Sequence, residues 1–244
     1  QRGGDIAVVN HDDPLVRNMA NGSQADVWPF SLETRLPFGL WLDGDTFRFG
    51  EEALATLNDT LLRGRHNLQN VICALAMMRA GNFNWPGVLQ GLRSFKGVEH
   101  RIEYVTTIDD VAYFNDSKST NIDSLKVALE AFTVPLVLIA GGQGKGADYR
   151  VLSHLMRQHV RKMITIGEDA PKLEQAFGEF IPYERATDMA DAVRRSAAAA
   201  LSGDAVLLSP ACASFDMYNS FEHRGTVYKD AVRVFAAETG RAST

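Results

Sequence analysis

Residues 135–140, PLVLIA, form an unbroken apolar run that leads directly into the glycine-rich segment GGQGKG at 141–146. A short apolar run of this kind, bounded by proline and glycine, is typical of a strand buried on both faces of a parallel sheet. Similar runs predict strands at 110–115 (DVAYFN), 162–167 (KMITIG) and 205–210 (AVLLSP), and apolar residues at helical spacing predict helices around 122–132, 149–158, 170–177, 187–201 and 226–238. This alternation predicts an α/β fold with a doubly wound, Rossmann-like, mostly parallel sheet and helices on both faces.

The residues before this region have a different organisation and composition. Strand-like patterns at 5–10, 39–43 and 46–50 precede helical patterns at 67–80 and 86–92. An Asp-Gly pair separates the second and third strands and predicts a hairpin. No lysine occurs before Lys96, whereas seven lysines occur from there onward. We therefore place a boundary near Ser94, which predicts domains at 1–94 and 95–244.

Composition excludes several classes of protein. The chain has 244 residues, of which 45% are hydrophobic, and its net charge of −5 is spread along the sequence, so nucleic acid is not an expected partner. No apolar stretch approaches the roughly 18 residues that span a bilayer. The two cysteines, Cys73 and Cys212, lie in apolar runs, which favours a reducing compartment, the cytoplasm. Because the chain begins with Gln rather than Met, we expect a fragment or a processed product. We also expect a monomer.

Ligands of doubly wound sheets bind beyond the carboxyl ends of the strands, where three segments of this chain are rich in polar groups. The segment 115–121 (NDSKSTN) offers a carboxylate, an ammonium and hydroxyls that suit a polyanion, although helix capping by Ser119 or Thr120 explains it equally well. The segment 141–146 has glycines that let backbone amides approach a ligand, and Lys145 adds a positive charge. It does not match a nucleotide P-loop, and a simple tight turn is the favoured alternative.

The third segment, 209–216 (SPACASFD), follows the last predicted strand and precedes FEHRG at 221–225. Its small residues and two serines suit hydrogen bonding to a carboxylate, and Phe221 suits the wall of a pocket. Cys212 is compatible with a nucleophile, but a small buried thiol is favoured.

Two smaller groups also stand out. Asn67 and Asn70, just after His66, share one face at the start of a predicted helix, where an N-cap is an equally good explanation. His100 and Arg101 precede a strand, and by itself such a pair is more typical of a surface.

Six motifs, in this order and spacing, resemble the Mur ligases, and within them the members that add D-glutamate to UDP-N-acetylmuramoyl-L-alanine. The motifs are VNHDDP (9–14), GRHNLQN (64–70), FKGVEHRIEY (95–104), FNDSKSTN (114–121), IAGGQGKGADY (139–149) and LSPACASFDMYNSFEHRG (208–225). The resemblance covers nearly the whole chain. It implies ATP-dependent amide ligation in peptidoglycan precursor synthesis: ATP phosphorylates the substrate carboxylate, and the amine of D-glutamate attacks the acyl phosphate.

The resemblance also implies roles for individual residues. Asn67 and Asn70 are expected to contact the adenine side of ATP, and Arg101 and Asp116 its ribose and phosphates. The glutamate pocket is expected to consist of Lys145, Thr120, Ser214 and Phe221, with Lys118 and the backbone around Phe215 in support. Arg101, Asp116 and Lys118 form the expected catalytic set.

Two elements of the resembled family are absent from this sequence. It has no GxxGK[ST] phosphate loop, and residues 1–94 contain no lysine that could be carbamylated. Residues 1–94 therefore resemble the second half of the central ATP-binding domain, and 95–244 resemble the C-terminal amino-acid-binding domain. ATP and Mg²⁺ are the expected cofactors, with the ligands of the metal mostly outside this chain and no metal site within it. We predict that this polypeptide alone does not ligate.

Alternatives remain open within and beyond the family. Another amino-acid-adding ligase, including a folylpolyglutamate synthase or a variant that adds L-glutamate, would share these residue types. A dinucleotide-dependent oxidoreductase or Rossmann-like binding module requires GxGxxG after a first strand and an acidic residue about 20 positions later, and neither occurs. A purely structural domain predicts that Lys145 and Ser214 are solvated and far apart.

Overall fold

Residues 2–62, 65–240 and 242–243 are described by the computed structural model, in which the chain divides into two units, Gln1–Gly97 and Val98–Thr244. The side chain of His66 lies outside the described residues. The division comes one residue after Lys96, at which lysine first occurs in the sequence, and three residues after the predicted boundary at Ser94. Each unit is described by itself.

The first unit is an α/β arrangement around one mixed sheet. Its elements are β1 (Ile6–Asn10), α1 (Pro14–Ala20), β2 (Asp26–Ser31), β3 (Leu40–Asp43), β4 (Thr46–Phe49), β5 (Glu52–Thr56), the 3₁₀ turn η1 (Leu57–Asp59), α2 (Arg65–Ala80) and α3 (Trp85–Ser94). The strand order is β1-β2-β3-β4-β5, with parallel pairing from β1 to β3 and antiparallel pairing from β3 to β5. β3 and β4 form the hairpin that the Asp-Gly pair predicts, whereas α1, β2 and β5 were not predicted.

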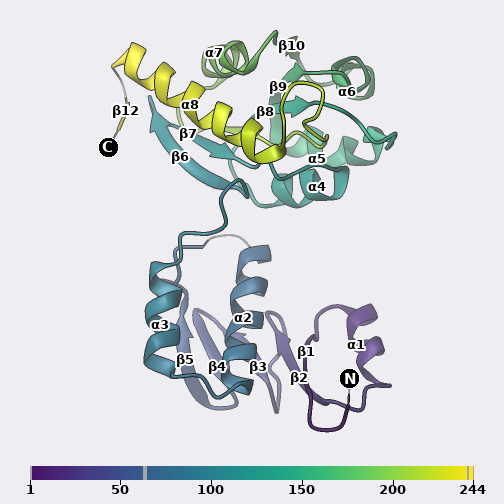
Figure 1. Ribbon diagram of the computed structural model, residues 1–244, viewed down its shortest axis with the longest axis vertical. Helices are drawn as coiled ribbons and strands as arrows, with labels where there is room; N and C mark the ends of the chain where they lie inside the picture. Colours follow the sequence, from purple (N-terminus) through teal and green to yellow (C-terminus); the bar gives the residue numbers. More distant parts are fainter. Residues whose placement is uncertain (1, 63–64, 241, 244) are drawn as a thin grey trace. The chain divides into compact units, whose positions relative to one another are not determined.

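One face of this sheet packs against α2, which crosses the sheet in Figure 1. Phe30, Leu40 and Phe47 from three strands form a core with Ile72 and Leu75 of α2, and all of these side chains are buried. On the other face, the short helix α1 packs against β1 and β2.

The second unit contains the remaining elements. They are β6 (Glu103–Ile108), β7 (Val111–Asn115), α4 (Ile122–Glu130), β8 (Leu136–Gly141), the 3₁₀ turn η2 (Tyr149–Leu152), α5 (Ser153–His159), β9 (Val160–Ile166), α6 (Ala170–Phe177), β10 (Tyr183–Arg185), α7 (Met189–Ala199), β11 (Ala205–Leu208), α8 (Phe221–Thr239) and β12 (Ala242–Ser243). The sheet has the order β10-β9-β8-β11-β7-β6-β12 and is parallel from β10 to β7, with β6 and β12 antiparallel at one edge. The prediction of a mostly parallel, doubly wound sheet is confirmed.

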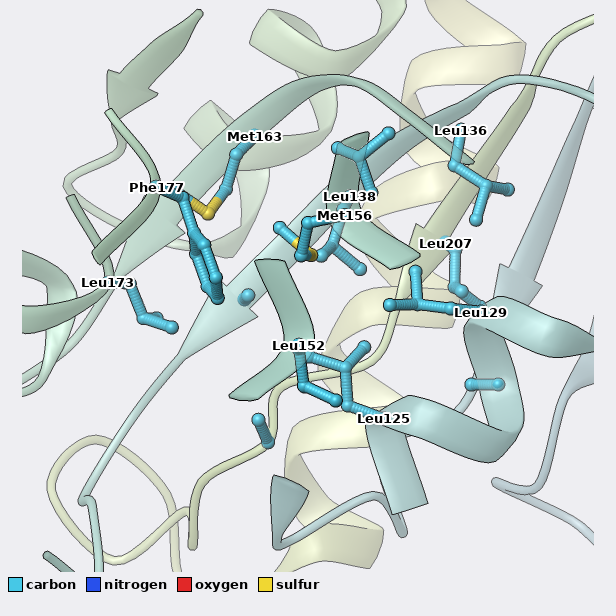
Figure 2. Packing of buried hydrophobic residues seen from close by; sticks show 14 of the residues in the cluster. Leu125, Leu129, Leu136, Leu138, Leu152, Met156, Met163, Leu173, Phe177 and Leu207 are labelled. Carbon is cyan, nitrogen blue, oxygen red and sulfur yellow. The ribbon is translucent and has the colours of Figure 1, made fainter. Parts of the chain in front are cut away.

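Helices cover both faces of this second sheet, and all six residues of β8 are buried. Leu138 and its neighbours two positions away face a core that includes residues of α4, α5 and α6, and Figure 2 shows Leu138 among Met156, Leu129 and the other side chains of this cluster. Val137 and Ile139 point to the opposite face, against residues of α7 and α8. The period-two alternation of a strand thus accounts for the unbroken apolar run, because both sets of side chains are covered.

One helix boundary and one helix cap differ from the sequence prediction and affect the site. α8 begins at Phe221 rather than near 226, because the side chain of Ser220 caps it by accepting a hydrogen bond from the backbone N–H of His223. The N-cap of α4 is Asn121, which accepts from Ser124 N at 2.8 Å. The alternative in which Ser119 or Thr120 caps this helix is therefore wrong.

Candidate functional site

The three polar segments identified in the sequence follow β7, β8 and β11, and β11 lies between the other two strands in the sheet. Because these strands are parallel, their carboxyl ends reach the same edge of the sheet. The three segments therefore emerge next to one another.

The glycine segment after β8 pairs with the segment after β11 through its backbone. Gln143 and Ala213 exchange both hydrogen bonds, each 2.9 Å long, and Gly141 N donates to Pro210 O at 2.9 Å. Gly142 has a φ of +129°, and a Cβ there would lie 2.4 Å from Ala213 O. Glycine is required at this position because the two backbones approach too closely for a side chain.

Asp116 connects the segment after β7 to the same neighbour. Its Oδ2 accepts a hydrogen bond from Ser209 Oγ at 2.8 Å, and its Oδ1 accepts one from Ile102 N at 3.2 Å. The residue is only 5% exposed. Burial raises the pKa of the Asp116 carboxyl to about 7, although Ser209, Ile102 N and the charges of Arg101 and Arg224 oppose the shift. This carboxyl can therefore exchange a proton near neutral pH.

Arg224, on the first turn of α8, joins two of the segments and was not predicted as a site residue. Its guanidinium is buried and donates to Ser117 Oγ at 3.0 Å and to the carbonyl oxygens of Ser117, Cys212 and Ala213 at 2.9, 3.0 and 3.1 Å. Burial lowers the pKa of Arg224 to about 10, which leaves the group charged at neutral pH. No spacing in the sequence indicates this role, because the partners of Arg224 lie between 11 and 107 positions away along the chain.

Lys118 and Phe221 come together beside Arg224. The Lys118 ammonium lies 5.6 Å from the centroid of the Phe221 ring, and Ser117 Oγ donates to Phe221 O at 2.7 Å. Lys118 is exposed and Phe221 is half-buried. A cation held over an aromatic face is suited to an anionic ligand with a carbon chain, because the ammonium attracts the anion and the ring contacts the chain.

The remaining residues of the expected glutamate pocket differ in exposure. Lys145 is exposed, Thr120 is half-buried and Ser214 is buried. The pairing of Gln143 with Ala213 brings the segments of Lys145 and Ser214 side by side. Thr120 belongs to the segment of Asp116.

Phe215 and Cys212, both in the segment after β11, differ in exposure. Phe215 exposes 69% of its surface, and Cys212 is fully buried. Burial raises the pKa of the Cys212 thiol to about 11, which favours the buried thiol over the nucleophile.

His100 and Arg101 precede β6. His100 is 5% exposed, so the surface interpretation is wrong for this residue, whereas Arg101 is exposed. Asn115 Nδ2 lies 2.9 Å from His100 Nδ1, and because an amide nitrogen only donates, Nδ1 accepts and the ring proton is assigned to Nε2. His100 O accepts from Lys118 N at 3.0 Å, which fixes the segment of Lys118 from its other side.

Asn67 and Asn70 lie in the first two turns of α2 in the first unit, where Asn67 is half-buried and Asn70 is exposed. In the parts of the chain that the structure describes, no group of three or more His, Cys, Asp or Glu side chains is arranged to hold a metal ion. Within the same described parts, no helix is long and apolar enough to cross a bilayer.

Comparison with known proteins decides the family. Residues 100–212 match the family described as Mur ligase, glutamate ligase domain. A protein of Desulfitobacterium hafniense named UDP-N-acetylmuramoylalanine--D-glutamate ligase is 40% identical over 239 residues, which cover 96% of this chain and 53% of that protein. The chain belongs to the Mur ligase family. It spans about half the length of the curated relatives that it matches.

Solved structures of Mur ligases and related enzymes have the same fold. A pseudomurein peptide ligase type C from Methanothermus fervidus superposes with a TM-score of 0.68 at 12% identity, covering 93% of this chain and 56% of its own. The MurF ligase of Thermotoga maritima, solved in complex with ADP, has a TM-score of 0.64 at 16% identity and covers 95% of this chain and 54% of its own. At these identities the likeness concerns the fold alone.

Proposed function

We propose that this chain is part of a cytoplasmic, monomeric, ATP-dependent carbon–nitrogen ligase of peptidoglycan precursor synthesis that adds D-glutamate to UDP-N-acetylmuramoyl-L-alanine. The names of relatives at about 40% identity support this reaction. The chain spans about half of those relatives, so the reaction is proposed for the whole protein.

The observation that carries the proposal is the junction of three segments at one edge of the second sheet. Buried Arg224 and the backbone pair at Gln143 hold these segments together. The same segments expose the cations Lys118 and Lys145. A free amino acid with two carboxylates requires such fixed cations, together with the hydroxyls of Thr120 and Ser214, to orient its amine.

The proposed nucleotide contacts are Asn67 and Asn70 on the adenine side, and Arg101 and Asp116 at the ribose and phosphates. ATP supplies the phosphoryl group that makes the substrate carboxylate an electrophile. The sequence contains no phosphate loop, and the described carboxylates are not grouped to hold Mg²⁺, so these residues supply only part of a nucleotide site. We therefore expect this polypeptide alone to release no phosphate.

The test is ligation by the full-length protein with ATP and UDP-N-acetylmuramoyl-L-alanine, using D- and L-glutamate in parallel and measuring phosphate release. We expect release with D-glutamate only. Lys145→Ala should raise KM for D-glutamate by about tenfold or more, because a charge-assisted hydrogen bond is lost. Lys126→Ala, at an exposed lysine on α4, serves as the matched control and should leave KM unchanged. Preference for L-glutamate, or an unchanged KM in Lys145→Ala, would contradict the proposal.

A further inference from the structure

Asp169, just before α6, is a buried acid outside the three segments described above. It is 2% exposed, and both of its carboxylate oxygens have partners. The Tyr149 hydroxyl donates to Oδ2 at 2.8 Å, and the Lys172 ammonium donates to Oδ1 at 2.7 Å. We refer to Asp169 and Tyr149 together as the Asp169 brace.

The brace contacts the glycine segment after β8 at Gly142 and Gly144, and the chain reaches Tyr149 three residues after the segment ends. The backbone N–H of Asp169 donates to Gly142 O at 2.9 Å. Its carboxylate lies against Gly144, where a Cβ would be only 1.7 Å from Oδ2. Tyr149, which follows the segment, donates to the same oxygen. Lys145 therefore follows a glycine whose backbone lies directly against the Asp169 carboxylate.

A second hydrogen bond connects the brace to the segment after β11. The Tyr149 hydroxyl lies 3.1 Å from Cys212 Sγ. Since the single hydroxyl proton goes to Asp169, the thiol donates to the hydroxyl oxygen. Burial raises the pKa of both the Tyr149 hydroxyl and the Cys212 thiol, so both groups keep their protons at neutral pH. Cys212 O in turn accepts from Arg224.

We propose that Asp169 and Tyr149 are positioning residues for Lys145, and that they set the affinity of the enzyme for the incoming amino acid. This inference rests on the proposed role of Lys145. Glycines at 141, 142, 144 and 146 make the backbone of this segment intrinsically permissive. Without the brace, the segment would have to be ordered when the amino acid binds, and that entropy loss would weaken binding.

The test is Tyr149→Phe in the full-length enzyme, which removes one hydroxyl and keeps the buried ring. KM for D-glutamate should rise roughly 3- to 10-fold, as expected for one lost hydrogen bond, while KM for ATP, KM for the UDP substrate and kcat stay unchanged. Tyr104→Phe, which removes the exposed hydroxyl paired with Thr107 on β6, is the matched control and should change no KM. A purely structural role would lower the melting temperature and leave KM for D-glutamate unchanged, and this result would overturn the inference.

A double-mutant cycle separates action through Lys145 from an independent effect. In the Lys145→Ala background, Tyr149→Phe should not raise KM for D-glutamate further. An equal rise in both backgrounds would overturn the inference and leave the proposed function intact. If Lys145→Ala alone leaves KM for D-glutamate unchanged, the result contradicts the proposed function, and the inference that rests on it is overturned as well. Asp169→Asn, which keeps an oxygen acceptor for Tyr149, is the second variant if Tyr149→Phe does not fold.

Discussion

The second sheet carries helices on both faces, whereas α2 and α3 cover one face of the first sheet and the short α1 packs on β1 and β2 at the other. All six residues of β8 are buried, but in β4 only Phe47 is. A strand covered from both sides becomes a continuous apolar run, and a strand covered from one side keeps polar positions. The difference in covering explains why the two units differ so much in sequence pattern.

Both units have exposed ion pairs, but among the described residues only the second unit buries charged side chains. In the first unit, Arg48 pairs with Asp43 at the surface, as Arg35 does with Glu51. In the second unit, Asp116, Asp169 and Arg224 are buried where polar segments meet at the sheet edge. Buried charges cost solvation free energy, so they persist where a network of hydrogen bonds compensates them.

The largest expected effect is the difference in stability loss between replacing a buried arginine of the second unit and replacing an ion-paired surface arginine of the first. Arg224→Met should lower the free energy of unfolding by about 4 kcal/mol, because carbonyls of Ser117, Cys212 and Ala213 lose their buried donor. Arg48→Met, which removes an exposed ion pair, should cost less than about 1 kcal/mol. Urea denaturation of both variants measures the contrast. Equal losses of unfolding free energy in the two variants would show that the buried guanidinium of Arg224 does not hold the segments together.

The stability of each unit can be lowered separately at one fully buried leucine, Leu138 on β8 or Leu40 on β3. Each Leu→Ala change should cost about 3 kcal/mol, through lost burial and the cavity left behind. All three tryptophans, at positions 28, 41 and 85, lie in the first unit, so their fluorescence reports on that unit alone. Leu40→Ala should move the tryptophan transition in urea, and Leu138→Ala should move the circular dichroism transition of the second unit.

The effect of a mutation in one unit on the unfolding transition of the other shows whether the two units unfold separately. If Leu138→Ala moves the tryptophan transition as far as Leu40→Ala does, the two units unfold as one cooperative body, and the division at Gly97 has no thermodynamic meaning.

The difference in helix covering between the two sheets also explains how far the sequence could predict the fold. β7, β8, β9 and β11 were predicted because both faces of each are covered. β2 and β5 were missed because each begins with an exposed charged residue, Asp26 or Glu52, and has only two buried positions, and because β2 contains Pro29. The five-residue error at the start of α8 arose because FEHRG was placed before the helix, although Ser220 precedes it as a cap.

The sequence could predict those features of the candidate site that follow from the order of the strands in the sheet. Strand order brings the segments of Asp116, Lys145 and Ser214 to one edge, and a rule for parallel sheets anticipates that. The roles of Arg224 and Asp169 were not predictable, because their partners are backbone carbonyls, a glycine and a tyrosine up to 107 positions away in sequence. Spacing within one segment carries no information on such contacts.

The smallest expected effect is a difference in the pH dependence of stability between the two units. Asp116 has a raised pKa of about 7, so between its usual value near 3.8 and about 7 the folded state holds a proton that the unfolded state has lost. The stability of the second unit should therefore fall as pH rises through this window, by about 2 kcal/mol between about pH 5.5 and 7. Asp116→Asn should remove this slope from the circular dichroism transition.

Asp59 in the first unit should show the opposite sign. Thr56 N and Arg93 hold the pKa of Asp59 below its usual value of 3.8, so its contribution is present above that value and is lost as pH falls through the folded pKa. Tryptophan fluorescence in urea at a series of acidic pH values should show a stability loss that Asp59→Asn reduces, while the same variant leaves the slope between about pH 5.5 and 7 unchanged. Slopes of the same sign in both units would mean that Asp116 is charged throughout and that its burial does not govern its proton.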